Sequence, residues 1–179
     1  METLVRYSHR KEPFYFSFQS RAIWILRDAM SDEHAEHRKE KEHIIAELCV
    51  DLIDHYGWYL ANIHIGELVP VVSQEGWSYP EVDILLTDGT GRPSTLIKVA
   101  PRENYAEGLA DAAQELFLLA HALRLELSAS PLSLVYSTRW HENGGTKEQV
   151  ITIDYSRFKS FAAWAEAGRP SSDTLPRRI

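Results

Sequence analysis

Residues 79–101 read YPEVDILLTDGTGRPSTLIKVAP, and this stretch decides the fold of the chain. Two apolar runs, one ending at Thr87 and the other beginning near Thr95, flank a segment rich in Gly and Pro that starts with Asp88 and Gly89. An Asp-Gly pair between two such runs is typical of a β-hairpin. We therefore predict adjacent antiparallel strands over residues 80–88 and 94–100.

The predicted hairpin carries one charged residue inside each apolar run, Asp83 in the first and Lys98 in the second. In a metal-dependent phosphodiesterase, carboxylates bind the cation and a Lys orients or polarises the attacking water. Such a site needs a second acid two residues before the Lys, and this chain has Leu96 there. The hairpin thus predicts a nuclease-like arrangement, with the Asp83 and Lys98 side chains on a common face, that lacks one carboxylate.

The segments around the hairpin predict an α/β domain with a mixed β-sheet flanked by helices. Apolar periodicity favours helices over residues 32–55, 104–127 and 158–167, and further strands over 62–72, 132–138 and 148–154. The connection from 94–100 through the second helix to 132–138 is long enough for a parallel, right-handed crossover. The order of these helices and strands therefore predicts the α/β fold class.

An ordered set of motifs resembles the PD-(D/E)xK nuclease superfamily, and within it the N-terminal domain of type I restriction enzyme R subunits. The set spans roughly residues 38–168 and consists of Glu42 near a helix start, Gly57-Trp58, the strand at 63–67, Asp83, Lys98 and Ala100-Pro101. The resemblance implies a restriction-endonuclease-like fold. It also implies Asp83, Lys98 and Glu42 as catalytic residues and Asp83 as a metal ligand.

Surviving catalysis would require another carboxylate in place of the one missing at Leu96. Glu81 lies two residues before Asp83 and therefore shares its strand face. We predict Asp83 and Glu81 as the ligands of one Mg²⁺, completed by water, if the chain is active. In an alternative register, residues 97 and 99 take the acid and Lys positions, and the motif is lost altogether.

Length and composition fit one main domain. The chain has 179 residues, of which 44% are apolar, and no apolar run of about 18 residues that could span a membrane. No signal peptide is apparent, so we expect a cytoplasmic protein without a membrane partner. We divide the chain into an N-terminal arm with a short helix (1–30, helical from 21), the α/β domain (31–168) and a flexible tail (169–179).

The net charge of −7 argues against strong autonomous DNA binding, because phosphate neutralisation requires local Lys and Arg. Candidates for a local basic patch are Arg92, Lys98, Arg102, Arg139 and Lys147. The leading hypothesis is a degenerate restriction-endonuclease-like domain with an incomplete metal site. Its expected role is that of a DNA-associated module in a restriction-modification or defence system, with DNA and other restriction-modification subunits as partners.

Two alternatives stay open. The chain could be an active Mg²⁺-dependent DNA endonuclease with a relocated carboxylate, or a protein-interaction domain without a nucleic-acid role. The sequence does not decide whether the protein is an enzyme.

Overall fold

The computed structural model describes residues 15–18, 21–24, 33–73, 76–127 and 132–178. The helices are α1 (Glu33–Asp54), η1 (Leu60–Asn62, a 3-10 turn), α2 (Arg102–Leu127) and α3 (Phe161–Glu166). The strands are β1 (Tyr15–Phe18), β2 (Arg21–Trp24), β3 (Ile63–Leu68), β4 (Val71–Ser73), β5 (Gly76–Ser78), β6 (Glu81–Thr87), β7 (Pro93–Val99), β8 (Ser133–Glu142) and β9 (Gly145–Asp154).

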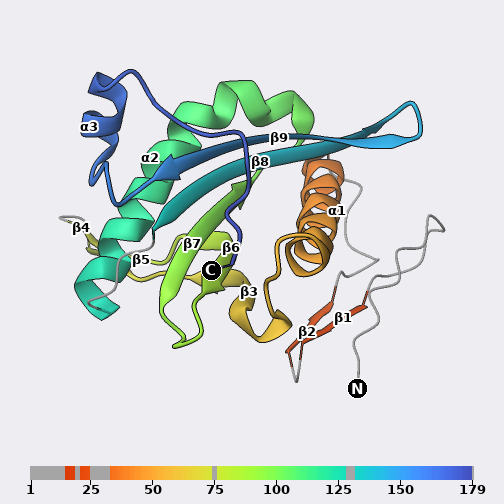
Figure 1. Ribbon diagram of the computed structural model, residues 1–179, viewed down its shortest axis with the longest axis horizontal. Coiled ribbons are helices and arrows are strands. Elements are labelled where there is room, and N and C mark those ends of the chain that lie inside the picture. Colours follow the sequence, from red (N-terminus) through yellow and green to blue (C-terminus); the bar gives the residue numbers. More distant parts are fainter. Residues whose placement is uncertain (1–14, 19–20, 25–32, 74–75, 128–131, 179) are drawn as a thin grey trace.

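The main sheet has five strands in the order β3-β6-β7-β8-β9. Strands β7 and β8 are parallel and the other neighbouring pairs are antiparallel. The predicted hairpin is therefore present as β6 and β7, and α2 is the predicted crossover to β8 (Figure 1). The expectation of an α/β fold with a mixed sheet flanked by helices is confirmed.

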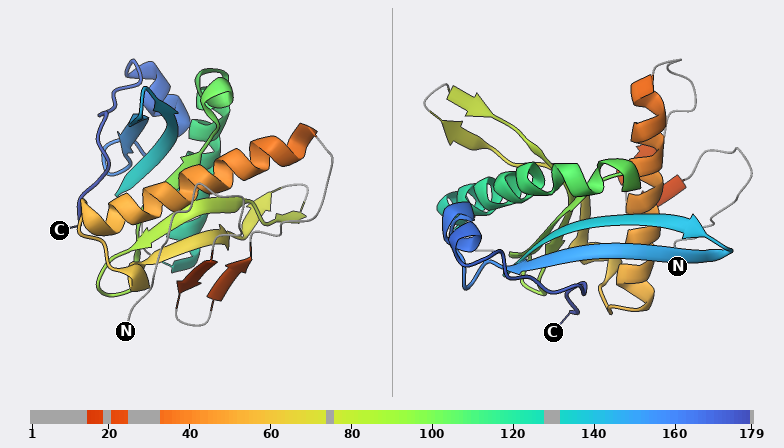
Figure 2. Two further views of the ribbon diagram at one scale, coloured as in Figure 1. Left: turned by 90° about the vertical axis from the view of Figure 1, so that its right-hand side faces the viewer. Right: turned by 90° about the horizontal axis from the view of Figure 1, so that it is seen from above.

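The sheet lies between α1 and α2 (Figure 2). On one face Leu48 and Leu52 of α1 pack against Ile84 and Ile97, and these side chains belong to one buried cluster. A second cluster on the other face joins residues of α2 to the sheet and α3; it includes Val82, Leu96, Leu116, Phe117, Leu134 and Trp164. Burial of these two apolar faces is the main force that holds the three layers together.

The edge strand β3 and its neighbour β6 continue beyond the sheet as one long hairpin arm. Leu68 pairs with Glu81 at the end of the sheet, and Val71 pairs with Ser78 in β4 and β5 with the register unchanged. The Val69 amide donates to the Pro80 carbonyl (N···O 3.0 Å) across the gap between the two pairs. The sequence predicted a strand over 62–72 but not β5, which is only three residues long.

Two expectations at the chain ends need correction. Residues 21–24 form β2, paired with β1, where a helical turn over 21–30 was predicted; residues 25–30 lie outside the described part of the chain. The segment after Gly168 was predicted to be a flexible tail, but it packs on the domain. Leu175 is only 3% exposed, because it fills the cluster beneath α1, and the indole of Trp58 donates to the Pro176 carbonyl (3.0 Å).

Within the described ranges, no helix is both long enough and apolar enough to cross a membrane.

Candidate functional site

The point where the hairpin arm leaves the sheet is a fork between β6 and β7. Pairing of these strands runs only as far as Ile84 with Ile97, and β3 carries Gly66 opposite Asp83. Gly66 has a φ of +66°, which is readily available only to glycine, so it permits a sharp local twist. As a result Val82 packs beneath α2 whereas Ile84 packs beneath α1. Asp83 lies at the crossing point.

The Asp83 carboxylate is buried in this fork and both of its oxygens have partners. The side chain is 1% exposed. Its Oδ2 accepts a hydrogen bond from the Val99 amide (2.7 Å), which has no strand partner in β6 at that position. Its Oδ1 lies 2.7 Å from the ammonium group of Lys41 in α1. The Asp83 carboxylate therefore accepts the hydrogen bond that a carbonyl of β6 would accept if the two strands were still paired there. Lys41 compensates the negative charge of this carboxylate.

Lys98 is committed to a different partner on the opposite face of the sheet. Its ammonium group lies 2.8 Å from Glu115 of α2 and donates to the Glu81 carbonyl (3.1 Å). Among the described contacts, no hydrogen bond or ion pair joins Asp83 to Lys98. The two strands are adjacent and antiparallel as predicted, but the prediction that Asp83 and Lys98 share one face is wrong, because each side chain pairs with a helix on a different face of the sheet. This placement counts against the resemblance to the nuclease superfamily as well as against the predicted site.

The other predicted site residues also lie apart from one another. Glu42 is half-buried on α1, but its neighbour Lys41 is the residue that reaches Asp83. The side chain of Glu81 is exposed and lies beside Gly66, while its carbonyl accepts from Lys98. No group of three or more metal-binding side chains forms within the part of the chain that the structure describes. A cation at Asp83 would have to displace Lys41.

Leu96 occupies the core and not an open site. It is 0% exposed, pairs with Leu85 across the hairpin and belongs to the cluster beneath α2. The residues of β7 that face α1 are Ile97 and Val99, both buried. Neither strand face of β7 therefore presents an acid near Asp83, which is what both sequence registers predicted.

Two tyrosines on the α2 side of the sheet have raised pKa values because they are buried. Tyr105 stacks on Tyr136 with ring centroids 4.6 Å apart. Burial, followed by the negative charge of Asp83, raises the pKa of Tyr136 to about 12. Both phenols are therefore neutral at physiological pH, and neither supplies a base near the fork.

A second polar region lies between α1 and the long hairpin of β8 and β9. Arg139, only 4% exposed, forms ion pairs with Asp51 of α1 and Glu148 of β9. His141 Nε2 lies 2.7 Å from Glu47, in the part of β8 that extends beyond the strand predicted over 132–138. Arg139, His141 and Glu47 border an open pocket of about 370 Å³. They tie α1 to the hairpin, and we assign them a structural role.

The cations predicted to form a basic patch do not form a single cluster. Lys98 and Arg139 are held in the ion pairs above, and the Arg102 guanidinium lies 4.4 Å from the ring centroid of Trp140. Arg92 is exposed far along the chain at the turn between β6 and β7, and Lys147 is exposed in β9 directly opposite Trp140.

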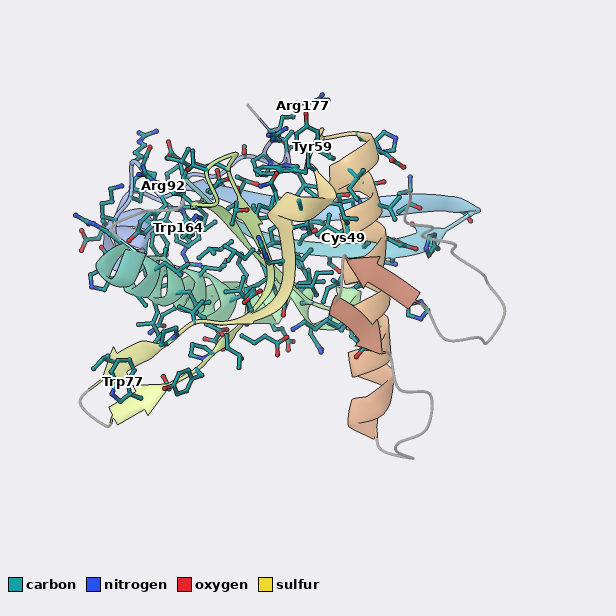
Figure 3. All side chains as sticks on the ribbon, turned by 90° about the horizontal axis from the view of Figure 1, so that it is seen from below. Cys49, Tyr59, Trp77, Arg92, Trp164 and Arg177 are labelled. Carbon is teal, nitrogen blue, oxygen red and sulfur yellow. The ribbon has the colours of Figure 1, made fainter. Side chains whose placement is uncertain are left out.

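A pair of arginines that the sequence reading missed lies at another edge, on the docked C-terminal segment. The Arg178 guanidinium lies 3.8 Å from the ring centroid of Tyr59, and that of Arg177 lies 5.7 Å from the ring of Tyr56. Figure 3 shows Arg177 and Tyr59 at the same end of the molecule. The Arg178 amide donates to the Tyr56 carbonyl (3.1 Å), which fixes the segment in place.

We call these four residues the arginine edge. Tyr59 is 62% exposed and Arg177 is also exposed. Within the described residues, neither guanidinium forms an ion pair with a carboxylate. The edge therefore presents two cations and an accessible aromatic ring on a chain whose net charge is −7. This site was not predicted from the sequence, because a flexible tail was expected there. The aromatic residues Tyr56, Trp58 and Tyr59 could have indicated a surface on which the C-terminal segment packs.

No family model matches the chain, and comparison with curated proteins gives no match either.

Proposed function

We propose that the chain is a non-cleaving, restriction-endonuclease-like domain that acts as a DNA-associated module, with the arginine edge as its contact to DNA phosphates. The observation that carries the non-cleaving part is the fork. The buried Asp83 holds Lys41 and the Val99 amide where a nuclease would hold a metal ion. A role in restriction-modification or defence follows only from the resemblance of the motifs.

The fold supports this proposal through its element order. A helix, an antiparallel hairpin, a long crossover helix and a parallel strand occur in the order that the resemblance implies. The ways in which the site differs from the nuclease pattern support a loss of catalysis. Asp83 and Lys98 pair with helices on opposite faces, and Leu96 fills the core.

The arginine edge supports DNA binding through its chemistry. Arg guanidinium groups bind phosphate oxygens in a planar, two-pronged geometry, and exposed tyrosines stack on unpaired bases. The stacked arrangement holds the guanidinium of Arg178 in place before a ligand arrives, which lowers the entropic cost of binding.

The test is fluorescence anisotropy with labelled duplex and single-stranded DNA at about 50 mM and about 200 mM salt. We expect binding that weakens as salt rises. The double variant Arg177→Gln/Arg178→Gln should bind at least about tenfold more weakly and show a salt slope smaller by up to about 2, because two phosphate contacts are removed.

A matched control is available at α3. Arg157 lies over Phe158 (5.1 Å) and Arg169 over Trp164 (6.0 Å), so Arg157→Gln/Arg169→Gln removes the same charge and the same kind of ring contact. This control should leave DNA affinity within about twofold of the unmodified chain, apart from the general effect of charge. Equal losses in both double variants, or no binding at the lower salt concentration, would overturn the proposal.

A further inference from the structure

The outer part of the hairpin arm exposes an apolar surface that the proposed DNA contact does not use. Leu68, Val72, Trp77 and Tyr79 are 59%, 66%, 63% and 59% exposed. We call these four residues the apolar ribbon face. The arm projects away from the body of the molecule, and Trp77 lies near its tip (Figures 2 and 3).

The strand register places all four side chains on one face. Val72 pairs directly with Trp77, and Leu68 pairs with Glu81. Because side chains alternate along a strand, Leu68 and Val72 share a face of the first strand, and Trp77 and Tyr79 share that same face of the second.

On the opposite face of the arm, the first strand is packed against the domain. Val69 and Val71 are 2% and 4% exposed and belong to the cluster beneath α2. The arm is therefore anchored along one side and open along the other. The four exposed side chains offer on the order of 500 Å² of apolar surface, which is the size of patch that usually marks an interaction site.

The charge at the end of this face selects the kind of partner. Glu81 lies on the same face, two residues beyond Tyr79, and its exposed carboxylate forms no ion pair within the described residues. The nearby Lys98 is held by Glu115. Nucleic-acid phosphates would meet repulsion here, and a second copy would bring the same carboxylate and another net charge of −7.

We infer that the apolar ribbon face is a docking surface for a different protein, one that offers an apolar groove bordered by Lys or Arg. The patch is smaller than the roughly 800 Å² that each partner contributes to a standard interface, so the basic border next to Glu81 completes the contact. The aromatic pair of Trp77 and Tyr79 forms its centre, since such residues dominate binding at interfaces.

The test is selection of random displayed peptides on the unmodified chain, followed by affinity measurement on variants. We expect peptides that combine apolar residues with Lys or Arg. Their affinity should fall at least about tenfold with either Trp77→Ser or Val72→Ser, which change opposite strands of one face. It should fall a few-fold with Glu81→Gln and with rising salt.

Leu132→Ser is the matched control, because Leu132 is 57% exposed but lies just before β8, outside the arm. It should change peptide affinity by less than about twofold. Circular dichroism and thermal melting of each variant check that these surface changes leave the fold intact.

Four results would overturn the inference. Two concern the selection: it yields no peptide whose binding depends on Trp77, or it yields acidic peptides. The other two concern Trp77→Ser: this variant abolishes self-association of the chain, or it abolishes DNA binding. The last measurement also separates this inference from the proposed function, since loss of DNA binding in the arginine-edge variant leaves peptide binding unaffected.

Discussion

The fork at Asp83 and the arginine edge both place charged groups at the border of the sheet, but they treat those charges in opposite ways. At the fork the carboxylate is buried and each oxygen has an internal partner. At the arginine edge the cations are accessible, and aromatic rings are their described neighbours. A buried charge that the fold already satisfies is costly to leave unpaired, whereas a charge that the fold leaves accessible can bind a ligand.

The largest effect on stability is expected when an acid is introduced into the fork region. Leu96→Glu restores the carboxylate that the nuclease motif lacks, but it places that group in a fully buried apolar cluster beneath α2. We expect a loss of about 4 kcal/mol or more in the free energy of unfolding, measured by urea denaturation. Leu96→Met keeps the volume and should cost less than about 1.5 kcal/mol. A stable Leu96→Glu variant with new Mn²⁺ affinity would contradict our description of the fork.

A smaller effect is expected from removing the acid that is present. Asp83→Ala leaves the Val99 amide without an acceptor and should lower the free energy of unfolding by about 2 to 3 kcal/mol. Asp83→Asn keeps an oxygen for that amide and should cost less. Lys41→Met should cost about 1 to 3 kcal/mol, because it leaves the buried Asp83 carboxylate without its cation, although water can take over part of that role at Lys41, which is 34% exposed. Equal stability of Asp83→Ala and the unmodified chain would rule out a structural role for this carboxylate.

At the arginine edge, substitution should change the free energy of unfolding only slightly. Arg178→Gln removes an exposed ring contact and should change the free energy of unfolding by less than about 1 kcal/mol. DNA affinity, in contrast, should fall several-fold. A large loss of stability without any loss of DNA affinity would show that Arg178 only fastens the C-terminal segment.

The smallest effect concerns Asp154, an exposed carboxylate that the fold nonetheless satisfies. A hydrogen bond from the Ser156 hydroxyl lowers the pKa of the Asp154 carboxyl. Since the pKa is lower in the folded state, the stabilisation is present above the unfolded value and is lost as the pH falls through the folded value. Ser156→Ala should therefore reduce stability slightly at neutral pH but not in strong acid. Denaturation curves at both pH values would show the difference, and an equal effect at both would contradict it.

Much of the fold could be predicted because the apolar pattern is strong and local. The hairpin, the crossover helix and the outer strands follow from periodicity and from the Asp88-Gly89 turn. The short strand β5 and the docking of Leu175 could not, since they depend on contacts between distant segments. The β2 segment was predicted to be helical because four residues carry too little periodicity.

The candidate site was predictable only in part. The sequence identified Asp83 as unusual, because an acid inside an apolar strand needs a partner. It did not identify Lys41 as that partner, because helix rotation and the twist at Gly66 decide which α1 residue reaches the fork. The predicted catalytic roles of Asp83, Lys98 and Glu42 stay predictions, and the contacts of Asp83 and Lys98 offer those two residues a structural alternative.

The central claim is that Asp83 holds an internal cation and leaves no metal-dependent chemistry. The most direct measurement combines Mn²⁺ titration, followed by electron paramagnetic resonance, with incubation of supercoiled DNA and the same ion. The account predicts that the signal of free Mn²⁺ is undiminished and that the DNA stays intact. Mn²⁺ binding together with DNA cleavage, both lost in Asp83→Asn, would contradict it and establish an active endonuclease.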